Sequence, residues 1–508
     1  MSIPEECTVL VIGGGPAGSY AASVLAREGV DTVVLEAETF PRYHIGESLL
    51  PSFRYFLKFI DLDEKFDQHG FLQKHGASFK FNSLPPGYTN FVAAGGAGNY
   101  SWNVIRSEAD QLLFEHAGKS GAKVFDGVKV TAVGFEPAAN AGDLGRPVSA
   151  SWKRNVDGEC GTVRYKYLID ASGRSGMIST KYLKNRKYNQ GLKSVASWGY
   201  WESAGSYGPT PGDPISEAIQ DGSGWAWFIP LHDGSVSVGI IIKQELLAQK
   251  KQASGTANSR EFYLNTLKQT SVICKLLETA HMRSDDIKTA SDWSYRASDY
   301  ASPYLRIAGD AGCFIDPFFS SGVHLAMNSA LSAATTICAS LRGHCSEDDA
   351  VAWHSRKVAE AYTRFLMVVS GSLEQVYARE VPILNEVDEP GFDTAFEHFK
   401  PIIQGTIDAG GKLSATDVSQ SIEFCTSVIE KIESGCLAGL GPGENAPGGE
   451  RGCITTLSPS QHCDETMMKI VRLNRVLDLD TFAVDVIHGM APNMQRGNLG
   501  LAIVSQAG

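Results

Sequence analysis

The sequence predicts an α/β fold with an inserted β-rich region and a helical C-terminal part. Residues 8–35 read as a strand, a glycine-rich turn, a helix and a second strand. Apolar residues alternate with polar or small ones at 194–201 and 235–240, which is typical of half-buried strands. Beyond about residue 346 the apolar positions follow a helical spacing.

The composition fits a globular enzyme and argues against several other classes. At 508 residues, the chain is long enough for two or three domains. The net charge of −12 argues against a nucleic-acid partner, which would need a basic face. No apolar run is long enough to cross a membrane, and residues 1–6 do not resemble a signal peptide. The ten cysteines show neither a C-x-x-C pair nor a zinc-binding spacing, so we expect reduced thiols, no metal and a cytoplasmic location.

The first motif is a G-x-G-x-x-G turn between the strand at 8–12 and an alanine-rich helix at 19–27. Glycines allow the backbone to turn tightly and to approach a pyrophosphate, whose charge suits a helix N-terminus. Glu36 ends the second strand, at 32–35, where an acid can hold ribose hydroxyls. We therefore predict a Rossmann-like domain that binds FAD or NAD. The residues of the cofactor turn are Gly13, Gly14, Gly15, Ala17 and Gly18.

Three further segments favour FAD over NAD. Residues 40–48 (FPRYHIGES), residues 104–110 (VIRSEAD) and residues 309–312 (GDAG) follow one another in the order seen in flavin-dependent halogenases and related monooxygenases, which they resemble. Ala109 stands where these families have an aromatic residue. The resemblance implies a flavin domain of the glutathione-reductase and p-hydroxybenzoate-hydroxylase type. It assigns to FAD the residues Arg42, Glu47, Ser48, Arg106, Asp310 and Val323.

Residues 225–230 (WAWFIP) resemble the W-x-W-x-I-P signature of flavin-dependent halogenases. In that family the signature is held to keep the substrate away from the flavin while a small oxidant passes. The resemblance therefore places Trp225, Trp227 and Pro230 at a channel between the flavin and the substrate. Taken alone, the same residues indicate only a buried aromatic strand before a proline.

A halide site is expected where a small-residue helix begins, at about residues 321–341. Ser320 or Ser321 is the candidate N-cap. The first amides of a helix lack internal partners and lie at its positive end, so they can hold chloride without a cationic side chain. The resemblance places chloride or bromide at Ser321 and Gly322, beside the flavin. The alternative is an ordinary capped helix.

Residues 71–79 resemble the halogenase segment that carries a catalytic lysine, and the matching residue is Lys74. In the family, reduced flavin, O2 and halide give hypohalous acid, which this lysine captures as a haloamine or holds by a hydrogen bond. Capture needs a neutral amine, so burial should lower the pKa of Lys74. Lys80, on the opposite face of the next strand, is the rival, and both residues could instead be solvated surface lysines.

We expect a flavin domain over residues 1–350, in which the substrate region covers about 70–105 and 190–300, and a mostly helical domain over 351–508. The acidic run 346–349 is a strong helix start, and two helical patterns follow residue 458. The glycine-rich stretch 434–452 indicates a surface loop. Candidates for deprotonating a phenol are Asp464, Glu465 and His488, although each also reads as a solvated surface group.

The likeness is greatest to fungal halogenases of phenolic polyketides, of the radicicol halogenase type, at residues 41–48, 101–104 and 181–187. Phe319 stands where tryptophan halogenases have a glutamate, so the resemblance implies a phenolic substrate. Since no second nicotinamide-binding loop is evident, FADH2 would come from a separate reductase, a transient partner. Two alternatives stay open: a flavin monooxygenase that hydroxylates an aromatic ring, and a flavoprotein without catalytic activity.

Overall fold

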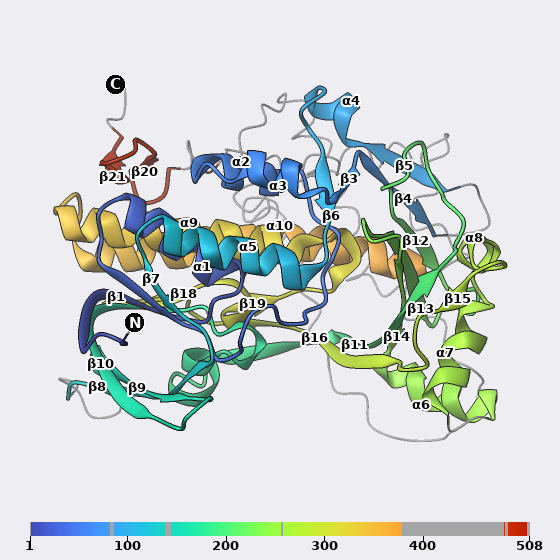
Figure 1. Cartoon of the computed structure of the whole chain (residues 1–508), viewed down its shortest axis with the longest axis horizontal. Coiled ribbons are helices and arrows are strands. Elements are labelled where there is room, and N and C mark those ends of the chain that lie inside the picture. The colour runs from blue at the N-terminus through green and yellow to red at the C-terminus, as the bar shows by residue number, and fades with distance from the viewer. Residues whose placement is uncertain are drawn as a thin grey trace, which may run out of the picture.

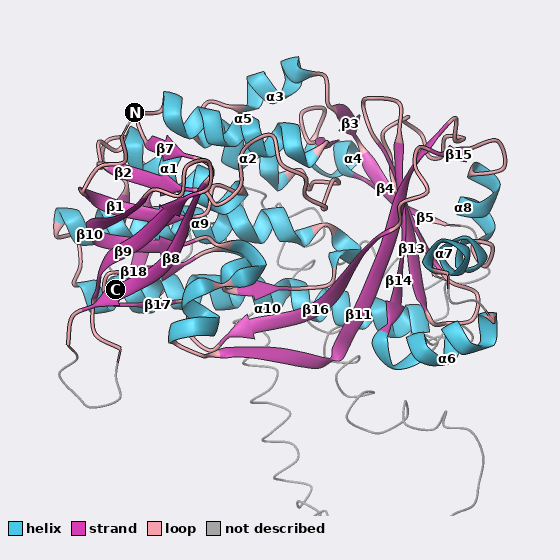
Figure 2. Ribbon diagram, turned by 60° about the horizontal axis from the view of Figure 1, so that its bottom comes forward, coloured by secondary structure: helices cyan, strands magenta, loops and turns pink. Residues whose placement is uncertain are grey.

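The computed structural model describes residues 2–81, 86–137, 144–255, 258–377, 482 and 486–504. Two β-sheets stand at opposite ends of this part of the molecule (Figure 1). The helices α9 (Ser321–Arg342) and α10 (Glu347–Tyr377) lie against each other and extend from one sheet to the other (Figure 2). The predicted α/β fold with an inserted β-rich region is confirmed.

The first sheet has, in the described residues, the strand order β17-β18-β10-β1-β2-β7, with β9 beside β10 and β8 beside β9. Its strands are β1 (Glu6–Ile12), β2 (Thr32–Leu35), β7 (Lys123–Phe125), β8 (Val128–Phe135), β9 (Pro147–Arg154), β10 (Cys160–Asp170), β17 (Ala301–Ser302) and β18 (Leu305–Ile307). The strands from β18 to β7 run parallel to one another. All four residues of β2 are buried, as expected for a parallel strand covered on both faces.

Helix α1 (Pro16–Arg27) connects β1 to β2 and starts at the glycine-rich turn, as predicted. Gly13 adopts a φ of +101°, and a Cβ there would lie 2.3 Å from the carbonyl oxygen of Ala171. A Cβ on Gly18 would lie 1.9 Å from the carbonyl oxygen of Gly13. At the first and third glycines of the motif, any side chain would therefore clash with the backbone of the protein, whether or not a ligand is bound.

The second sheet has, within the same described ranges, the order β19-β16-β11-β14-β13-β12-β4-β5, with β15 beside β11. Its strands are β4 (Gly76–Lys80), β5 (Gly87–Asn90), β11 (Arg186–Glu202), β12 (Ile215–Ala218), β13 (Gly224–Pro230), β14 (Val236–Lys243), β15 (His281–Met282), β16 (Lys288–Ala297) and β19 (Cys313–Phe314). The strands predicted at 194–201 and 235–240 lie in β11 and β14. Trp225 and Trp227 lie on β13, which is central in the sheet.

A small ladder connects the two regions: β3 (Leu72–Lys74) pairs with β6 (Ser101–Asn103), and Ser48 bridges to Asn103. The other helices are α2 (Ser52–Phe59), α3 (Asp63–His69), α4 (Phe91–Gly95), α5 (Arg106–Lys119), α6 (Gln244–Ser254), α7 (Ser259–Leu267) and α8 (Ser271–Leu276). Helices α5 and α9 both pack on α1. No helix in the described ranges is long and apolar enough to cross a membrane.

The C-terminal part differs from the sequence prediction. Helix α10 runs through residue 350, where we expected a domain boundary, and packs along α9. Residues 490–503 form a hairpin of β20 (Met490–Asn493) and β21 (Gly500–Ile503) instead of a helix. Leu499 and Leu501 are buried against the core, and most of the stretch after residue 458 in which helical patterns were predicted lies outside the described residues. The expected loop at 434–452 lies outside the described residues.

We expect Gly18→Ala to destabilise the protein, because its Cβ would clash with backbone and not with a movable side chain. The loss of unfolding free energy should be about 1–3 kcal/mol or more. Gly191→Ala is the control, since a Cβ there has no heavy atom within 4 Å. Urea unfolding of both variants checks the prediction, and equal stability would contradict it.

Candidate functional site

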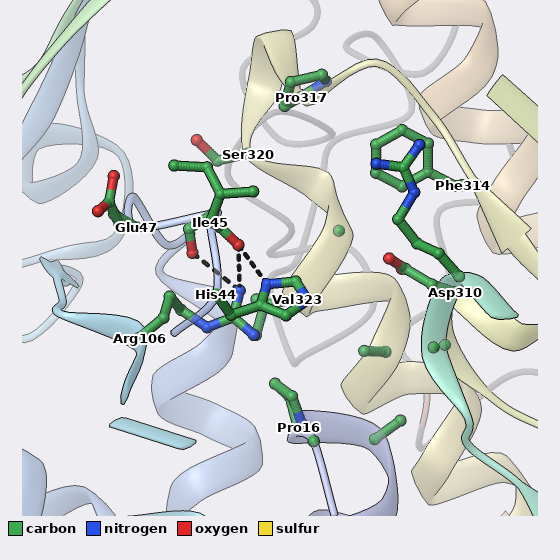
Figure 3. A pocket seen from close by; sticks show the side chains of 18 of the residues that line it. Pro16, His44, Ile45, Glu47, Arg106, Asp310, Phe314, Pro317, Ser320 and Val323 are labelled. Atoms are coloured by element: carbon green, nitrogen blue, oxygen red, sulfur yellow. Dashed lines mark hydrogen bonds between the residues drawn. The ribbon is translucent and has the colours of Figure 1, made fainter. Parts of the chain in front are cut away.

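A cavity of about 540 Å³ lies where the N-terminal ends of α1 and α9 meet the second sheet. Figure 3 shows Arg106, His44 and Ile45 on one side, and Asp310 and Phe314 on the other. Most of the predicted site residues line this cavity. They are Gly13, Gly15, Ala17, Glu36, Arg42, Glu47, Ser48, Lys74, Arg106, Trp225, Trp227, Asp310, Gly322 and Val323.

The glycine-rich turn and Glu36 form one end of the cavity. Oε2 of Glu36 accepts a 2.6 Å hydrogen bond from the amide of Gly14, and Oε1 accepts one of 2.8 Å from the amide of Glu38. In the described chain, no side chain caps α1 and no acid lies in its first turn, so its N-terminal amides remain available to an anion. This end of the cavity fits the diphosphate and ribose of a dinucleotide.

Arg106 is buried at the start of α5 and was expected to face the flavin. It donates to both oxygens of Asp110, at 2.8 and 3.0 Å, and to the carbonyl oxygens of Ile45 at 2.9 Å and Gly46 at 3.2 Å (Figure 3). Arg42 donates to the same carboxylate at 3.1 Å. Arg42 also lies 3.9 Å from Glu36 and 3.8 Å from Glu38, so both guanidinium groups of this wall are held by carboxylates.

Asp310 faces this wall across the cavity, on the short 3₁₀ turn at Gly309–Ala311 (Figure 3). Burial raises the pKa of Asp310 to about 6, against the attraction of Arg174, Arg106 and Arg186. A polar ligand group that donates to this carboxyl would lower the cost of its burial. The position fits the hydroxyl groups of the ribityl chain of FAD, the cofactor to which the family resemblance assigned Asp310.

Helix α9 begins at the cavity with Ser320 in the N-cap position. The predicted N-cap position of Ser320 is confirmed, but its φ is left-handed at +57° and its hydroxyl caps no amide of the described helix. Gly322 and Val323 line the cavity, whereas Ser321 is buried beside it. Oγ of Ser321 has no hydrogen-bond partner among the described residues. An uncapped helix start at a cavity is suited to an anion.

Aromatic rings line the part of the cavity next to the second sheet. The ring of Trp225 lies 6.0 Å from that of Trp227 and 4.8 Å, edge to face, from that of Phe318. Pro230 does not line the cavity, which corrects its assignment to the channel. Side chains alternate along a strand, so Pro230 lies on the opposite face from the tryptophans. Its carbonyl oxygen accepts a 2.9 Å hydrogen bond from Asn103.

Lys74 ends β3 and is 2% exposed. Its Nζ donates a 3.0 Å hydrogen bond to the carbonyl oxygen of Leu49 and lies 5.2 Å from the ring centre of Phe91. Burial lowers the pKa of Lys74 to about 7, and the negative charge of Asp213 opposes this shift. The rival, Lys80, is partly exposed at the end of β4 and does not line the cavity. Geometry therefore favours Lys74 over Lys80.

Glu47 is 3% exposed and lies two residues before Leu49, the partner of Lys74. Its Oε1 accepts a 2.6 Å hydrogen bond from the hydroxyl of Tyr200. Burial raises the pKa of Glu47 to about 7, although the hydrogen bond from Tyr200 and the nearby hydroxyl of Ser237 lower it. The cavity thus has a buried amine, Lys74, and two buried carboxyl groups, Glu47 and Asp310, whose pKa values are all shifted toward neutral pH.

Sequence reasoning missed several residues of this site. Trp198 and Tyr200 are two apart on β11, and their period-2 spacing in an alternating strand was the available signal. No sequence pattern pointed to Asp213. It accepts hydrogen bonds from the amides of His75 and Gly76, which follow Lys74 and are more than 130 residues away along the chain. Its carboxylate positions the turn after β3.

Two other predicted or possible sites lie away from the cavity. His488 is exposed at the hairpin beside the C-terminal end of α9, and Asp464 and Glu465 lie outside the described residues. The ligand atoms of His69, Glu108 and His232 lie within 4.8 Å of one another, an arrangement that could hold a metal ion and that the sequence did not predict. Both imidazoles bond to the Glu108 carboxylate, so ion pairing also accounts for it.

Comparison with known proteins shows the family to which this chain is similar. Residues 6–365 match the FAD binding domain family. The chain is 52% identical to the flavin-dependent halogenase otaD of Aspergillus carbonarius, over 100% of both chains. It is 51% identical to the flavin-dependent halogenase ascD of Acremonium egyptiacum, over 98% of this chain and 93% of the relative. It is 50% identical to the sulochrin halogenase gedL of Aspergillus terreus, over 99% of this chain and 94% of the relative.

Two solved structures are similar over most of the chain. The myxobacterial chondrochloren halogenase CndH superposes with a TM-score of 0.67 at 28% identity, covering 79% of this chain and 90% of that one. The flavin-dependent halogenase CmlS superposes with a TM-score of 0.65 at 29% identity, covering 84% of this chain and 79% of that one. The fold and the cofactor domain are therefore shared with FAD-dependent halogenases.

The lowered pKa of Lys74 predicts how its burial affects stability. Between pH 7 and the ordinary lysine pKa of 10.5, the unfolded chain keeps its proton on Lys74 while the folded protein loses it. The free-energy cost of burying the ammonium is therefore full below pH 7 and falls as the pH rises toward 10.5. Lys74→Met removes this cost, which is at most about 5 kcal/mol. We expect its stability gain over wild type, from urea unfolding, to shrink from pH 6 to pH 10. A gain that does not change with pH would contradict the shift, and Lys80→Met is the control.

Proposed function

Because this chain belongs to the flavin-dependent halogenases and carries an FAD binding domain, we propose that it halogenates an electron-rich phenolic ring through Lys74. FAD is its cofactor, and the reaction uses O2 and a halide. The observation that carries the proposal is the position of Lys74. It is a buried amine, with a pKa of about 7, in the same cavity as the glycine-rich turn.

Reduced flavin and O2 supply the oxidising equivalents that convert halide to hypohalous acid. Near neutral pH a large fraction of Lys74 is the neutral amine, because burial disfavours the ammonium. The amine exchanges one N–H for N–halogen and releases water. The ring carbon then takes the halogen from the nitrogen, and the ring proton returns to it. Lys74 thereby confines the oxidant to one position and is regenerated.

The lining of the cavity supports a phenolic substrate. Rings of Phe79, Phe318 and Phe319 pack together beside Trp225, with ring centres 4.8–5.6 Å apart. Phe319 replaces the carboxylate expected in tryptophan halogenases, and a phenol needs less activation because its hydroxyl group enriches the ring. A relative that halogenates sulochrin, in a fungal polyketide pathway, supports the same substrate class.

The halide and the supply of reduced flavin complete the proposal. The uncapped start of α9, at Ser321 and Gly322, is the place for chloride or bromide. The paired rings of Trp225 and Trp227 would keep the substrate from the flavin. A separate reductase, as a transient partner, would supply FADH2. The protein would work in the cytoplasm, where thiols such as its described free cysteines stay reduced.

We expect a product with a halogen isotope pattern when the protein is given FAD, a flavin reductase, NADH, O2, bromide or chloride, and a panel of phenolic polyketides. Lys74→Ala should lower product formation by about 100-fold or more while FAD still binds, because the amine acts on the reacting atom. Lys80→Ala is the matched control and should retain activity. Mass spectrometry of the products is the measurement. Halide-independent addition of oxygen would support a monooxygenase instead.

Ser321→Ala should weaken halide binding, because it removes a buried hydroxyl beside the helix start. One lost hydrogen bond is worth about 1 kcal/mol, which corresponds to roughly a fivefold rise in the KM for halide. The affinity for FAD should not change, and this serves as the internal control. An unchanged halide KM would remove Ser321 from the halide site.

A further inference from the structure

A row of hydrogen bonds leads from Glu47, at the cavity, to the molecular surface through two tyrosines to which no role has yet been assigned. The hydroxyl of Tyr200 donates to Oε1 of Glu47 at 2.6 Å. The hydroxyl of Tyr43 lies 3.0 Å from that of Tyr200. Nε1 of Trp198 donates to the hydroxyl of Tyr43 at 2.7 Å. The row joins β11 of the second sheet to the segment between β2 and α2.

The two ends of the row differ in exposure. Glu47 is 3% exposed and lines the cavity, and its Oε2 has no hydrogen-bond partner in the part of the chain that the structure describes. Tyr43 is 49% exposed, so its end of the row is in contact with solvent. An unsatisfied buried carboxyl oxygen is costly and marks a position where a ligand or reactant makes the missing contact.

The donors fix the direction of the row. An indole N–H only donates, so Trp198 occupies an acceptor site on Tyr43. Tyr200 uses its own proton on Glu47, and it therefore accepts the proton of Tyr43. Every O–H in the row is thus directed inward, toward the Glu47 carboxyl group. This order is the one required for moving protons from solvent to the cavity.

The reaction needs such a path because it consumes a proton. Reduced flavin (FADH2), O2, one halide ion and one proton give FAD, hypohalous acid and one water. The flavin and the halide each lose two electrons, and O2 gains four. Transfer of the halogen to the ring then releases a second water without net uptake of protons. A cavity that is lined by aromatic rings, and that must keep bulk water from the oxidant, needs a defined entry for this proton.

We propose that Tyr43 and Tyr200 form a proton relay that recharges Glu47, and that Glu47 donates the consumed proton to the cavity. Tyr200 passes its proton to Oε1 of Glu47 and takes that of Tyr43, which takes one from solvent. Rotation of the carboxyl group and of the two phenolic hydroxyl groups resets the row. Neither tyrosine ionises, because each accepts one proton as it releases another. The relay depends on the halogenase reaction, and not on Lys74 or on a phenolic substrate.

The electrostatics of the row agree with this role. Burial raises the pKa of Glu47 to about 7, so near neutral pH the group both holds and releases a proton. The groups that act on it are Tyr200, Ser237, Arg106 and Asp233. Burial, together with the charge of Glu47, raises the pKa of Tyr200, which keeps this phenol neutral. Burial also raises the pKa of Tyr43, whose charged neighbours include Asp286 and Lys288.

The first test needs no turnover. Infrared spectroscopy of the FAD-bound protein in H2O and D2O should show a carboxylic-acid stretch that titrates near pH 7 and is missing in Glu47→Gln. Because the Tyr200 hydrogen bond lowers the pKa of Glu47, Tyr200→Phe should move this midpoint to higher pH. Tyr55→Phe, which removes another partly exposed phenol from the surface of α2, should leave the midpoint unchanged. An unmoved midpoint in Tyr200→Phe would separate Glu47 from the row.

The second test measures proton uptake directly. The protein with reduced FAD is mixed with O2 and bromide in weak buffer, with a pH indicator and without any phenol. Wild type should take up one more proton per flavin with bromide than in a bromide-free run, which gives only hydrogen peroxide. Tyr200→Phe and Tyr43→Phe should each slow the uptake by about tenfold or more, with unchanged affinity for FAD. Tyr55→Phe is again the control.

The outcomes separate the relay from the proposed function. Uptake at the wild-type rate in both relay variants would overturn the relay, whatever the substrate proves to be. Slow uptake in both, together with the shifted infrared midpoint, would establish it even if the phenol panel gave no product. Slow uptake accompanied by weaker FAD binding would mean that the tyrosines only support the cavity wall, and this result would also overturn the relay.

Discussion

A buried ion pair holds the cavity wall together. Arg106 and Asp110 share two hydrogen bonds at the start of α5, and Arg42 reaches the same carboxylate from the segment after β2. An unpaired charge at this depth would cost several kcal/mol. The segment at 42–46 therefore cannot leave α5 without a large loss of stability. This constraint keeps this wall of the flavin site in place before the cofactor binds.

The residues that follow this ion-paired segment hold two further groups of the cavity, the carboxyl group of Glu47 and the amine of Lys74. The amide of Val104 donates to the carbonyl oxygen of Glu47 at 2.7 Å, which ties residues 47–49 to β6. The next residues of the segment provide the carbonyl oxygen of Leu49, which accepts from Lys74. The guanidinium group, the carboxyl group and the amine therefore share one short stretch of backbone. A shift of this stretch would move all three relative to the flavin.

The two sheets have different roles around this stretch. The parallel sheet ends at the glycine-rich turn and Glu36, where backbone amides and one acid suit a dinucleotide. The second sheet, which is antiparallel except between β12 and β4, presents aromatic side chains from one face, because period-2 alternation places Trp225 and Trp227 together. Helix α9 begins where the two sheets meet, which places its positive end at the cavity. The polar groups that suit the dinucleotide and the aromatic rings that line the rest of the cavity therefore belong to different sheets but lie next to each other.

The sequence by itself determined the features that depend on near neighbours or on a family motif. The β1-α1-β2 unit, the strands around Trp198 and Ser237, and the start of α9 all follow local patterns. Motif resemblance also selected Lys74 over Lys80. Only the tertiary structure decided the contacts between distant segments: Asp213 with the turn at His75, and Tyr43 with Tyr200, 157 residues away. It also placed Pro230 away from the channel and made a hairpin of residues 490–503. Such contacts depend on how whole elements pack, because no local preference specifies a partner so far along the chain.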